Sequence, residues 1–274
     1  MAQNQPTVFI ERLAGRAVRI YSAIVLIFLI SPILVTIPLS FNAGSYFSYP
    51  MSGFSLRWYE FVFASADWQR AFFNSLSIGV TSAILATVLG TSAALGLSQP
   101  QFPARNLVMS LLVSPMIVPV VVVAVGLYLV FAPLGLVNNY WGLILAHTAL
   151  GVPFVVITVT ATLSSFNWTL TRAAASLGAK PWTVFRKITL PLIMPGVVTG
   201  AIFAFATSFD EVIVVLFIGG VDQRTIPRQM WNGIRDQINP SILVVSTLLT
   251  LFAIALFVVI AWLRHRAMKA ARSG

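Results

Sequence analysis

The chain has 274 residues, of which 58% are hydrophobic and 9% are charged, and its mean hydropathy is +0.91. A water-soluble domain needs far more charged surface, so these values exclude an ordinary soluble protein and place the chain in a lipid bilayer. There is no cysteine and there are only two histidines, which excludes disulfides and thiolate chemistry and leaves little for a metal site.

Six apolar segments are long enough to cross a hydrocarbon layer about 30 Å thick, which takes about 20 helical residues. They lie at about 18–41, 72–98, 105–131, 141–163, 195–219 and 240–263. The first is longer than the apolar core of a signal peptide and no small-residue cleavage site follows it, so we expect it to stay as an anchor. The sequence therefore predicts an all-α integral membrane fold with six transmembrane helices.

The second segment is rich in small residues, which let helix backbones approach closely inside a membrane. We expect it to face protein along Gly79, Ser82, Ala83, Ala86, Gly90, Ala93 and Ala94. The stretch 42–71 that precedes it is too long for a simple turn, and its aromatic residues suit either an amphipathic segment or a plain aromatic belt at the membrane interface. These residues are Phe54, Trp58, Tyr59, Phe61, Phe63 and Trp68.

The net charge of +10 is a signal of orientation rather than of nucleic-acid binding. Six spans put both termini on one side, and that side carries twelve of the 17 Lys and Arg residues. The other five are Arg57, Arg70, Arg224, Arg228 and Arg235. Since positive charge is enriched on the cytoplasmic side, we expect both termini to be cytoplasmic.

The cytoplasmic stretch 164–194 predicts two short helices. Asn167 can cap the first, Gly178 can adopt the left-handed conformation that ends it, and Pro181 suits the first position of the second. We expect the second helix to end before the fifth span at Leu190-Pro191 and Pro195-Gly196. A helix-turn-helix DNA reader has a similar outline, but a loop held between two spans does not suit it.

This loop predicts a docking site for another protein. Small side chains on its first helix allow a close contact, and apolar side chains offer anchors for a groove. The small residues are Ala173, Ala174 and Gly178, and the anchors are Leu177, Val184, Phe185 and Ile188.

The fifth span contains two adjacent carboxylates, Asp210 and Glu211. Each charge costs about 2.5–3.5 kcal/mol to insert, so we expect a function for them. With Thr207, Ser208 and Phe203 they predict a polar and aromatic path for an organic cation. The alternative is a structural role, in which the acids are protonated or paired with Arg. For His147 in the fourth span, an interhelical hydrogen bond is favoured over transport.

The segment Arg172-Ala-Ala-Ala-Ser-Leu-Gly-Ala-Lys-Pro-Trp-Thr-Val-Phe-Arg-Lys-Ile-Thr-Leu-Pro-Leu-Ile-Met-Pro-Gly196 resembles the EAA loop of ABC importer permeases. The resemblance implies the type I importer permease fold, with 1–274 a single transmembrane domain and 164–194 its coupling loop. It also implies that a cytoplasmic ATPase contacts Arg172, Ala173, Ala174, Leu177, Gly178, Ala179 and Phe185. The family's usual Glu is Arg172 here, so an ion pair of that Glu would be absent or reversed.

Other segments are similar to the spermidine/putrescine branch of that family. They are Phe54-Ser-Leu-Arg-Trp-Tyr-Glu-Phe61, Asn74-Ser-Leu76, Thr225-Ile-Pro-Arg-Gln-Met-Trp-Asn-Gly-Ile-Arg235 and Asn239-Pro240. In that branch an acidic residue follows the Asn-Pro pair, whereas this chain has Ser241 there. This departure from the branch bears on the range of substrates. The resemblance implies import of a polyamine or related organic cation. Another cargo, such as an aminophosphonate, iron or thiamine, stays open. So does a different class of protein, an ion channel or a proton-coupled secondary carrier.

The resemblance also implies the partners. They are a second permease subunit, expected to be a different chain, two ATP-binding subunits, a periplasmic substrate-binding protein and membrane lipid, with no nucleic acid. The sequence has no GxxxxGKS phosphate loop, so we expect this chain not to hydrolyse ATP by itself, and we expect ATP and Mg to bind the partner subunits. We expect no catalytic, cofactor or metal site in this chain. We expect a multi-pass protein of the bacterial inner membrane.

Overall fold

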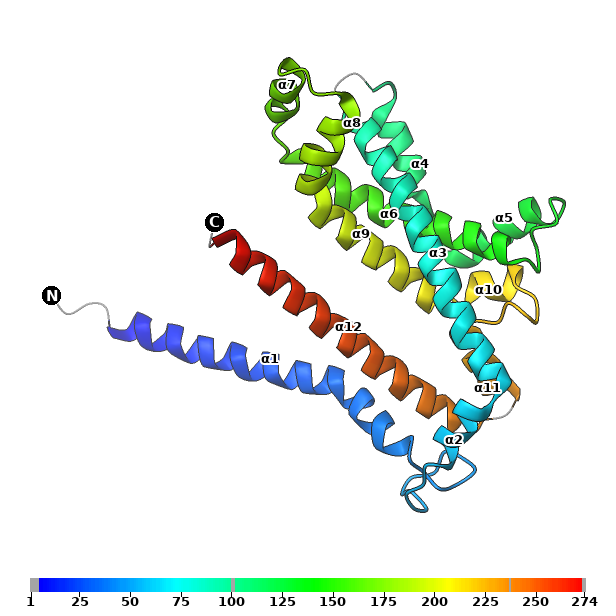
Figure 1. Cartoon of the computed structure of the whole chain (residues 1–274). Helices are drawn as coiled ribbons and strands as arrows, with labels where there is room; N and C mark the ends of the chain where they lie inside the picture. Colours follow the sequence, from blue (N-terminus) through cyan, green and yellow to red (C-terminus); the bar gives the residue numbers. More distant parts are fainter. Residues whose placement is uncertain (1–4, 100–101, 237, 273–274) are drawn as a thin grey trace. The chain divides into compact units, whose positions relative to one another are not determined.

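A computed structural model describes residues 5–99, 102–236 and 238–272, which form helices and no named strand (Figure 1). This confirms the all-α fold class. The contacts divide the chain into two compact units, one made of Met1–Ser65 with Gly233–Gly274 and the other of Ala66–Asn232. The single permease domain over 1–274 stays a prediction.

The first unit contains α1 (Gln5–Leu39), α2 (Arg57–Ala64) and α12 (Ser241–Arg272), and α12 packs on both of the others. The link from α1 to α2 is built around the buried side chain of Asn42. Its Oδ1 accepts hydrogen bonds from Gly44 N at 3.0 Å and from Ser52 Oγ at 3.1 Å. Phe54, Phe61 and Phe63 are exposed around this link and on α2, and their place at a membrane interface stays a prediction.

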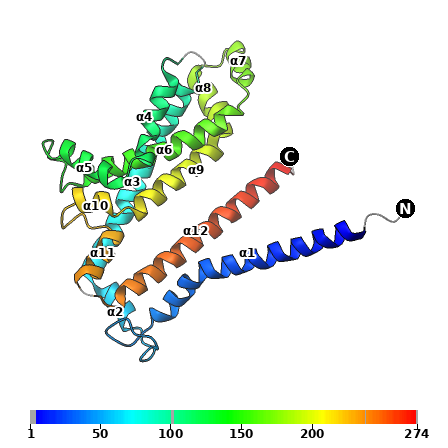
Figure 2. The same ribbon diagram turned by 180° about the vertical axis from the view of Figure 1, so that it is seen from behind.

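The core of the second unit is a bundle of α3 (Ala66–Leu97), α6 (Tyr140–Ser164) and α9 (Leu190–Asp210), as Figures 1 and 2 show. The small residues of α3 face this bundle, as the sequence predicts. A Cβ at Gly90 would lie 2.6 Å from Val155 Cβ, so only glycine lets α3 and α6 meet there. Of the predicted set only Ala93 is half-buried, and the other members are buried.

The third predicted span, 105–131, is wrong as a single straight helix. It forms α4 (Arg105–Ile117) and α5 (Val120–Phe131), which meet at 108°. Val118 between them is extended, with φ −72° and ψ 135°. A residue before proline is disfavoured in a helix, and Pro119 has no N–H to continue the hydrogen bonds, so the helix breaks here.

The helices on both sides of the fifth span also differ from the predicted ones. After α7 (Thr169–Ser176), α8 (Pro181–Val184) does not end at the prolines but runs through a π-helical turn, Phe185–Thr189, directly into α9. This wider turn relieves the clash that Pro191 would otherwise make with the carbonyl four residues earlier. At the other end α9 stops at Asp210, and the short α10 (Ile213–Ile218) and α11 (Ile226–Asp236) follow, so 195–219 is not one helix.

Four helical segments are each long and apolar enough to cross a membrane: Ala14–Leu39, Ala66–Leu97, Tyr140–Ser164 and Pro181–Asp210. The bent pair of α4 and α5 makes a fifth if it is one span. The predicted sixth span lies in α12, where the apolar part with described side chains, Ser241–Ala255, is shorter than a span. Four of the six predicted segments thus overlap a helix of full length, and the third corresponds to the bent pair. The sixth lies in a helix most of whose later side chains fall outside the described residues.

Candidate functional site

The loop between α6 and α9 has the local structure that the sequence predicts. Asn167 Oδ1 accepts a hydrogen bond from Thr169 N at 3.0 Å and so caps the start of α7. Gly178 has φ +82°, the left-handed conformation that favours glycine, and Pro181 is the first residue of α8. The two short helices of the loop are therefore fixed by signals within the loop itself.

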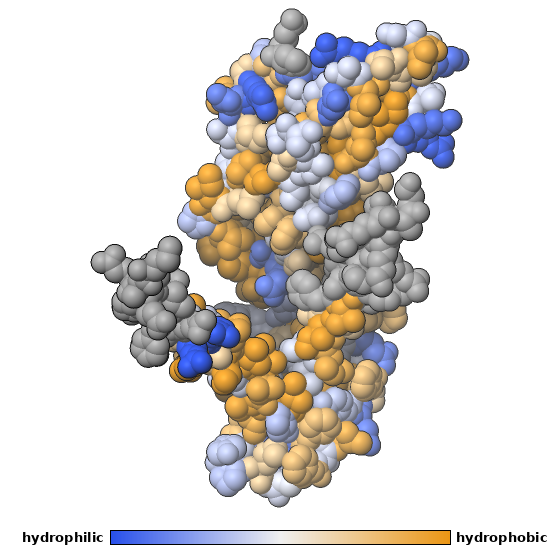
Figure 3. All heavy atoms as spheres, turned by 90° about the vertical axis from the view of Figure 1, so that its left-hand side faces the viewer, coloured by the Kyte–Doolittle hydropathy of each residue, from blue (hydrophilic) through white to orange (hydrophobic). Residues whose placement is uncertain are grey.

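The surface that this loop offers differs in part from the predicted set. Leu177 is 88% exposed, and Arg172, Ala173 and Gly178 are exposed beside it. Ala174, Ala179 and Phe185 are half-buried, so they are less available to a partner. Trp182, which the sequence analysis did not single out, is 69% exposed and lies 5.4 Å from Phe185 between ring centroids. Hydrophilic residues gather at this end of the second unit, at the top of Figure 3.

The two carboxylates lie at a break between helices rather than inside a span. Asp210 is the exposed last residue of α9, and Glu211 is extended with ψ 121°. Glu211 Oε1 accepts a hydrogen bond from Val214 N at 2.9 Å, which caps α10. Because α9 ends at Asp210, Glu211 does not continue the helical spacing that relates Thr207 to Asp210.

The five predicted path residues do not share one face. Phe203 and Asp210 are both exposed on α9, two turns apart, and therefore lie on the same side of the helix. Phe203 stacks on Phe154 of α6 at 6.0 Å between ring centroids. Thr207 is half-buried and Ser208 is buried. The exposed face thus combines an aromatic pair with one carboxylate, and Phe154 is a member that only the packing of α6 on α9 reveals.

Ser208 instead bonds to the histidine of the fourth span. Its Oγ lies 2.7 Å from His147 Nδ1, and both side chains are buried between α6 and α9. The predicted interhelical hydrogen bond of His147 is confirmed. This pair holds two helices of the bundle together, so Ser208 does not face the side that carries Phe203 and Asp210.

Ser208→Ala is expected to destabilise the protein by about 0.6 kcal/mol, and by no more than about 1.7 kcal/mol, the mean and the maximum measured for interhelical hydrogen bonds in a membrane protein. The thermal unfolding midpoint of the purified protein in detergent checks this. The matched control is Ser92→Ala, which removes a hydroxyl whose hydrogen bond, among the described residues, stays within its own helix and goes to Val88 O. Equal midpoints for the two variants would show that the His147 contact contributes nothing.

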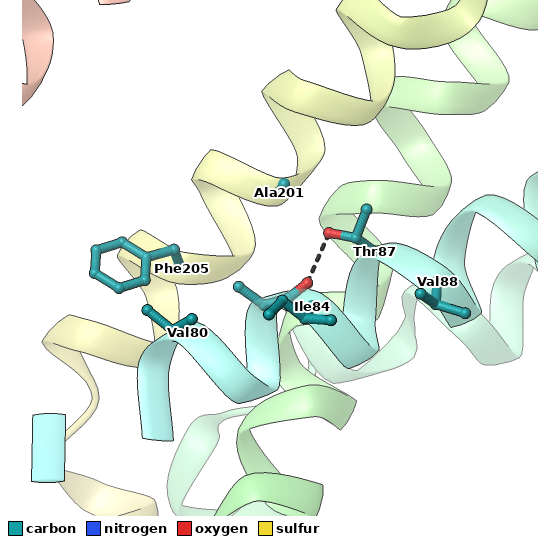
Figure 4. Close-up of a pocket in the computed structure, with 7 residues that line it drawn as sticks. Val80, Ile84, Thr87, Val88, Ala201 and Phe205 are labelled. Atoms are coloured by element: carbon teal, nitrogen blue, oxygen red, sulfur yellow. Dashed lines mark hydrogen bonds between the residues drawn. The ribbon is translucent and has the colours of Figure 1, made fainter. Parts of the chain in front are cut away.

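An apolar hollow of about 330 Å³ lies between α3 and α9, lined by Val80, Ala83, Ile84, Thr87, Val88, Ala201 and Phe205 (Figure 4). Thr87 Oγ1 donates to Ala83 O in the same helix, so the hollow presents almost no polar group. It does not include the carboxylates and does not suit a cation. Among the described residues, no three His, Cys, Asp or Glu side chains gather to hold a metal ion.

Known proteins that are similar to this chain in sequence or in fold are transport proteins. The Haemophilus influenzae protein named spermidine/putrescine transport system permease protein PotC is 32% identical over 86% of this chain and 91% of its own length. The Escherichia coli putrescine transport system permease protein PotI is 31% identical over 86% of this chain and 85% of its own. A bacterial ABC transporter involved in the import of alginate has the same fold, with a TM-score of 0.72 at 14% identity over 95% of this chain and 99% of its own.

The family described as binding-protein-dependent transport system inner membrane component matches residues 86–269, which include the coupling loop, both carboxylates and the break between them and α10. This match covers more than half of the 274 residues. The chain belongs to this family of ABC importer permeases.

Proposed function

We propose that this chain is one permease subunit of an ATP-driven importer of polyamines or closely related organic cations. The observation that carries the proposal is the identity of about one third to relatives named as spermidine/putrescine and putrescine permeases, over most of both chains. The exposed face of Phe203 and Asp210, backed by Phe154, supports it. The carboxylate attracts one alkylammonium group through its charge, and the aromatic rings two turns away on the same face attract another through their ring faces, which suits a molecule with several amines.

The proposed assembly contains a second permease subunit of different sequence, two ATP-binding subunits and a periplasmic substrate-binding protein. Both termini and the 164–194 loop lie in the cytoplasm, in keeping with the distribution of Lys and Arg. The exposed Leu177 and its neighbours dock on an ATPase, which supplies the ATP and Mg chemistry. The permease itself catalyses no reaction and provides half of the translocation path.

Reconstitution of the assembly in proteoliposomes tests this proposal. We expect ATP-dependent, saturable uptake of radiolabelled spermidine or putrescine, and no uptake of trehalose as a neutral control. Uptake of neither polyamine, with the binding protein present and loaded, would contradict the polyamine assignment. Polyamine flux without ATP would instead indicate a channel or a secondary carrier, in which the carboxylates act as a gate or relay.

A further inference from the structure

The loop between α10 and α11 is held rigidly against the beginning of α3. Asn74 Nδ2 donates to the backbone oxygens of Asp222 and Arg224, at 2.7 Å and 2.8 Å. The first N–H of α11, that of Ile226, donates to Ser75 Oγ at 2.8 Å. These contacts lie at the end of the second unit opposite to α7 and α8, as both ribbon views show (Figures 1 and 2). The start of α11 is therefore a fixed platform.

Four buried polar atoms without a hydrogen-bond partner among the described residues gather at this start. They are Arg224 Nε, Thr225 Oγ1, Arg228 Nε and Gln229 Oε1. Thr225 is 2% exposed, and its backbone oxygen accepts a hydrogen bond from Gln229 N, so it marks the first turn of the helix. Residues three and four positions apart share a helix face, which places the side chains of Thr225, Arg228 and Gln229 together. A buried polar group without a partner is costly, so a ligand is expected here.

The charge at this place is positive and uncompensated. Among the described residues, no carboxylate pairs with Arg224 or Arg228, because the nearby Asp222 pairs with Arg70 at 3.0 Å. Burial, and after it the neighbouring charge of Arg224, lowers the pKa of Arg228. Arg228 Nη1 donates to Gly220 O at 2.7 Å, which fixes that guanidinium in place. The two guanidinium groups repel each other, and an anion that lies between them turns this repulsion into a net attraction, because it pairs with both positive charges.

We propose that Arg224 and Arg228, at the N-terminus of α11 with the unpartnered Thr225, bind a carboxylate side chain of the substrate-binding protein. The dipole of an 11-residue helix adds to the attraction for an anion at this end. A guanidinium offers a planar fork that matches a carboxylate. The inference rests on the proposed function, which places this end of the unit outside the cytoplasmic membrane.

Charge excludes one other occupant of this site, and position excludes a second. A polyamine cation is repelled by two arginines, so the site does not bind the cargo. In the proposed assembly the ATPase docks at the opposite end of the unit, on α7 and α8, so it does not reach this site. The side chains of Arg224 and Arg228 are partly exposed, and the neighbouring Val221 and Asp222 are exposed, so another protein can reach the two arginines. A loaded binding protein is the partner on which this family depends.

The test measures how tightly the complete complex, in lipid nanodiscs, binds its own substrate-binding protein loaded with spermidine. Arg224→Gln and Arg228→Gln are each expected to weaken binding about tenfold or more, as does truncation of one partner in a desolvated charge pair. The matched control, Arg235→Gln, removes the same charge from an exposed arginine at the other end of α11 and should change binding less than about twofold. Raising the salt concentration should weaken the wild type more than the variants.

Arg228→Gln could disturb the loop, because it removes the hydrogen bond to Gly220 O. Arg224→Gln tests the charge without this effect, because Arg224 makes no side-chain hydrogen bond among the described residues. Binding by both variants within about twofold of the wild type overturns the proposal. Loss of the second permease from the variant complexes also overturns it and assigns the pair to a contact between permeases. Thermal protection of the wild type, but not the variants, by acetate without the binding protein assigns the site to a free anion. If the wild-type complex does not bind the substrate-binding protein at all, the proposed function itself is contradicted.

Discussion

Uptake of spermidine is expected to fall at least about tenfold when Asp210→Asn and Glu211→Gln are combined. Each change removes one negative charge and keeps nearly the same shape. Hydrogen bonds to a charged group contribute about 1.5–3 kcal/mol, and 1.4 kcal/mol corresponds to tenfold. Glu211→Gln keeps a side-chain oxygen, now that of an amide, which can still accept the hydrogen bond from Val214 N that caps α10. The measurement is initial uptake in proteoliposomes, alongside the amount of assembled complex.

The single variants separate the two carboxylates. Asp210 is exposed on the side of α9 that carries Phe203, whereas Glu211 is half-buried and engaged at the start of α10. We therefore expect Asp210→Asn alone to account for most of the loss. Asp67→Asn, which removes an exposed carboxylate from the first turn of α3, is the control and should leave uptake nearly unchanged. Full uptake in the double variant would make both residues structural and would leave the path without its charge.

The spans could be predicted from the sequence because length and hydropathy decide whether a segment can cross a bilayer. The breaks inside them could not. The run 105–131 is equally apolar whether or not it bends at Val118 and Pro119, and prolines also lie inside intact helices, such as Pro153 in α6 and Pro195 in α9. A proline breaks a helix unless neighbouring helices or a π-helical turn accommodate its missing N–H and its clash with the preceding turn. Whether they do so depends on how the helices pack, which the local sequence does not determine.

The same distinction holds for the candidate site. The coupling loop was predictable because its caps are local, with Asn167, Gly178 and Pro181 each acting within a few residues. The face of Phe203 and Asp210 was only partly predictable. Its aromatic partner Phe154 lies about 50 residues earlier, and Ser208 is withdrawn from it by His147, so both facts depend on how α6 packs on α9.

Leu177→Asp is expected to uncouple the importer, with binding-protein-stimulated ATP hydrolysis lost at least about tenfold. Leu177 is the most exposed apolar side chain of the coupling loop, so its replacement costs the permease fold little. In a docked complex the new carboxylate would be buried without a partner, which costs several kcal/mol. Gly178→Asp should act in the same direction. A Cβ at Gly178 meets nothing within 4 Å, but its φ of +82° adds about 1–2 kcal/mol of backbone strain.

Leu177→Met is the matched control, because it keeps an apolar side chain of similar volume and should preserve the coupling. Ala173→Arg probes the same exposed surface, and it is a cleaner probe than Ala174→Arg because Ala174 is half-buried and its replacement would disturb the loop itself. The assay compares ATP hydrolysis with and without loaded binding protein, at equal amounts of assembled complex. Stimulation that persists in Leu177→Asp, Gly178→Asp and Ala173→Arg alike would show that the ATPase contacts another surface, and the exposure of Leu177 would then need another cause.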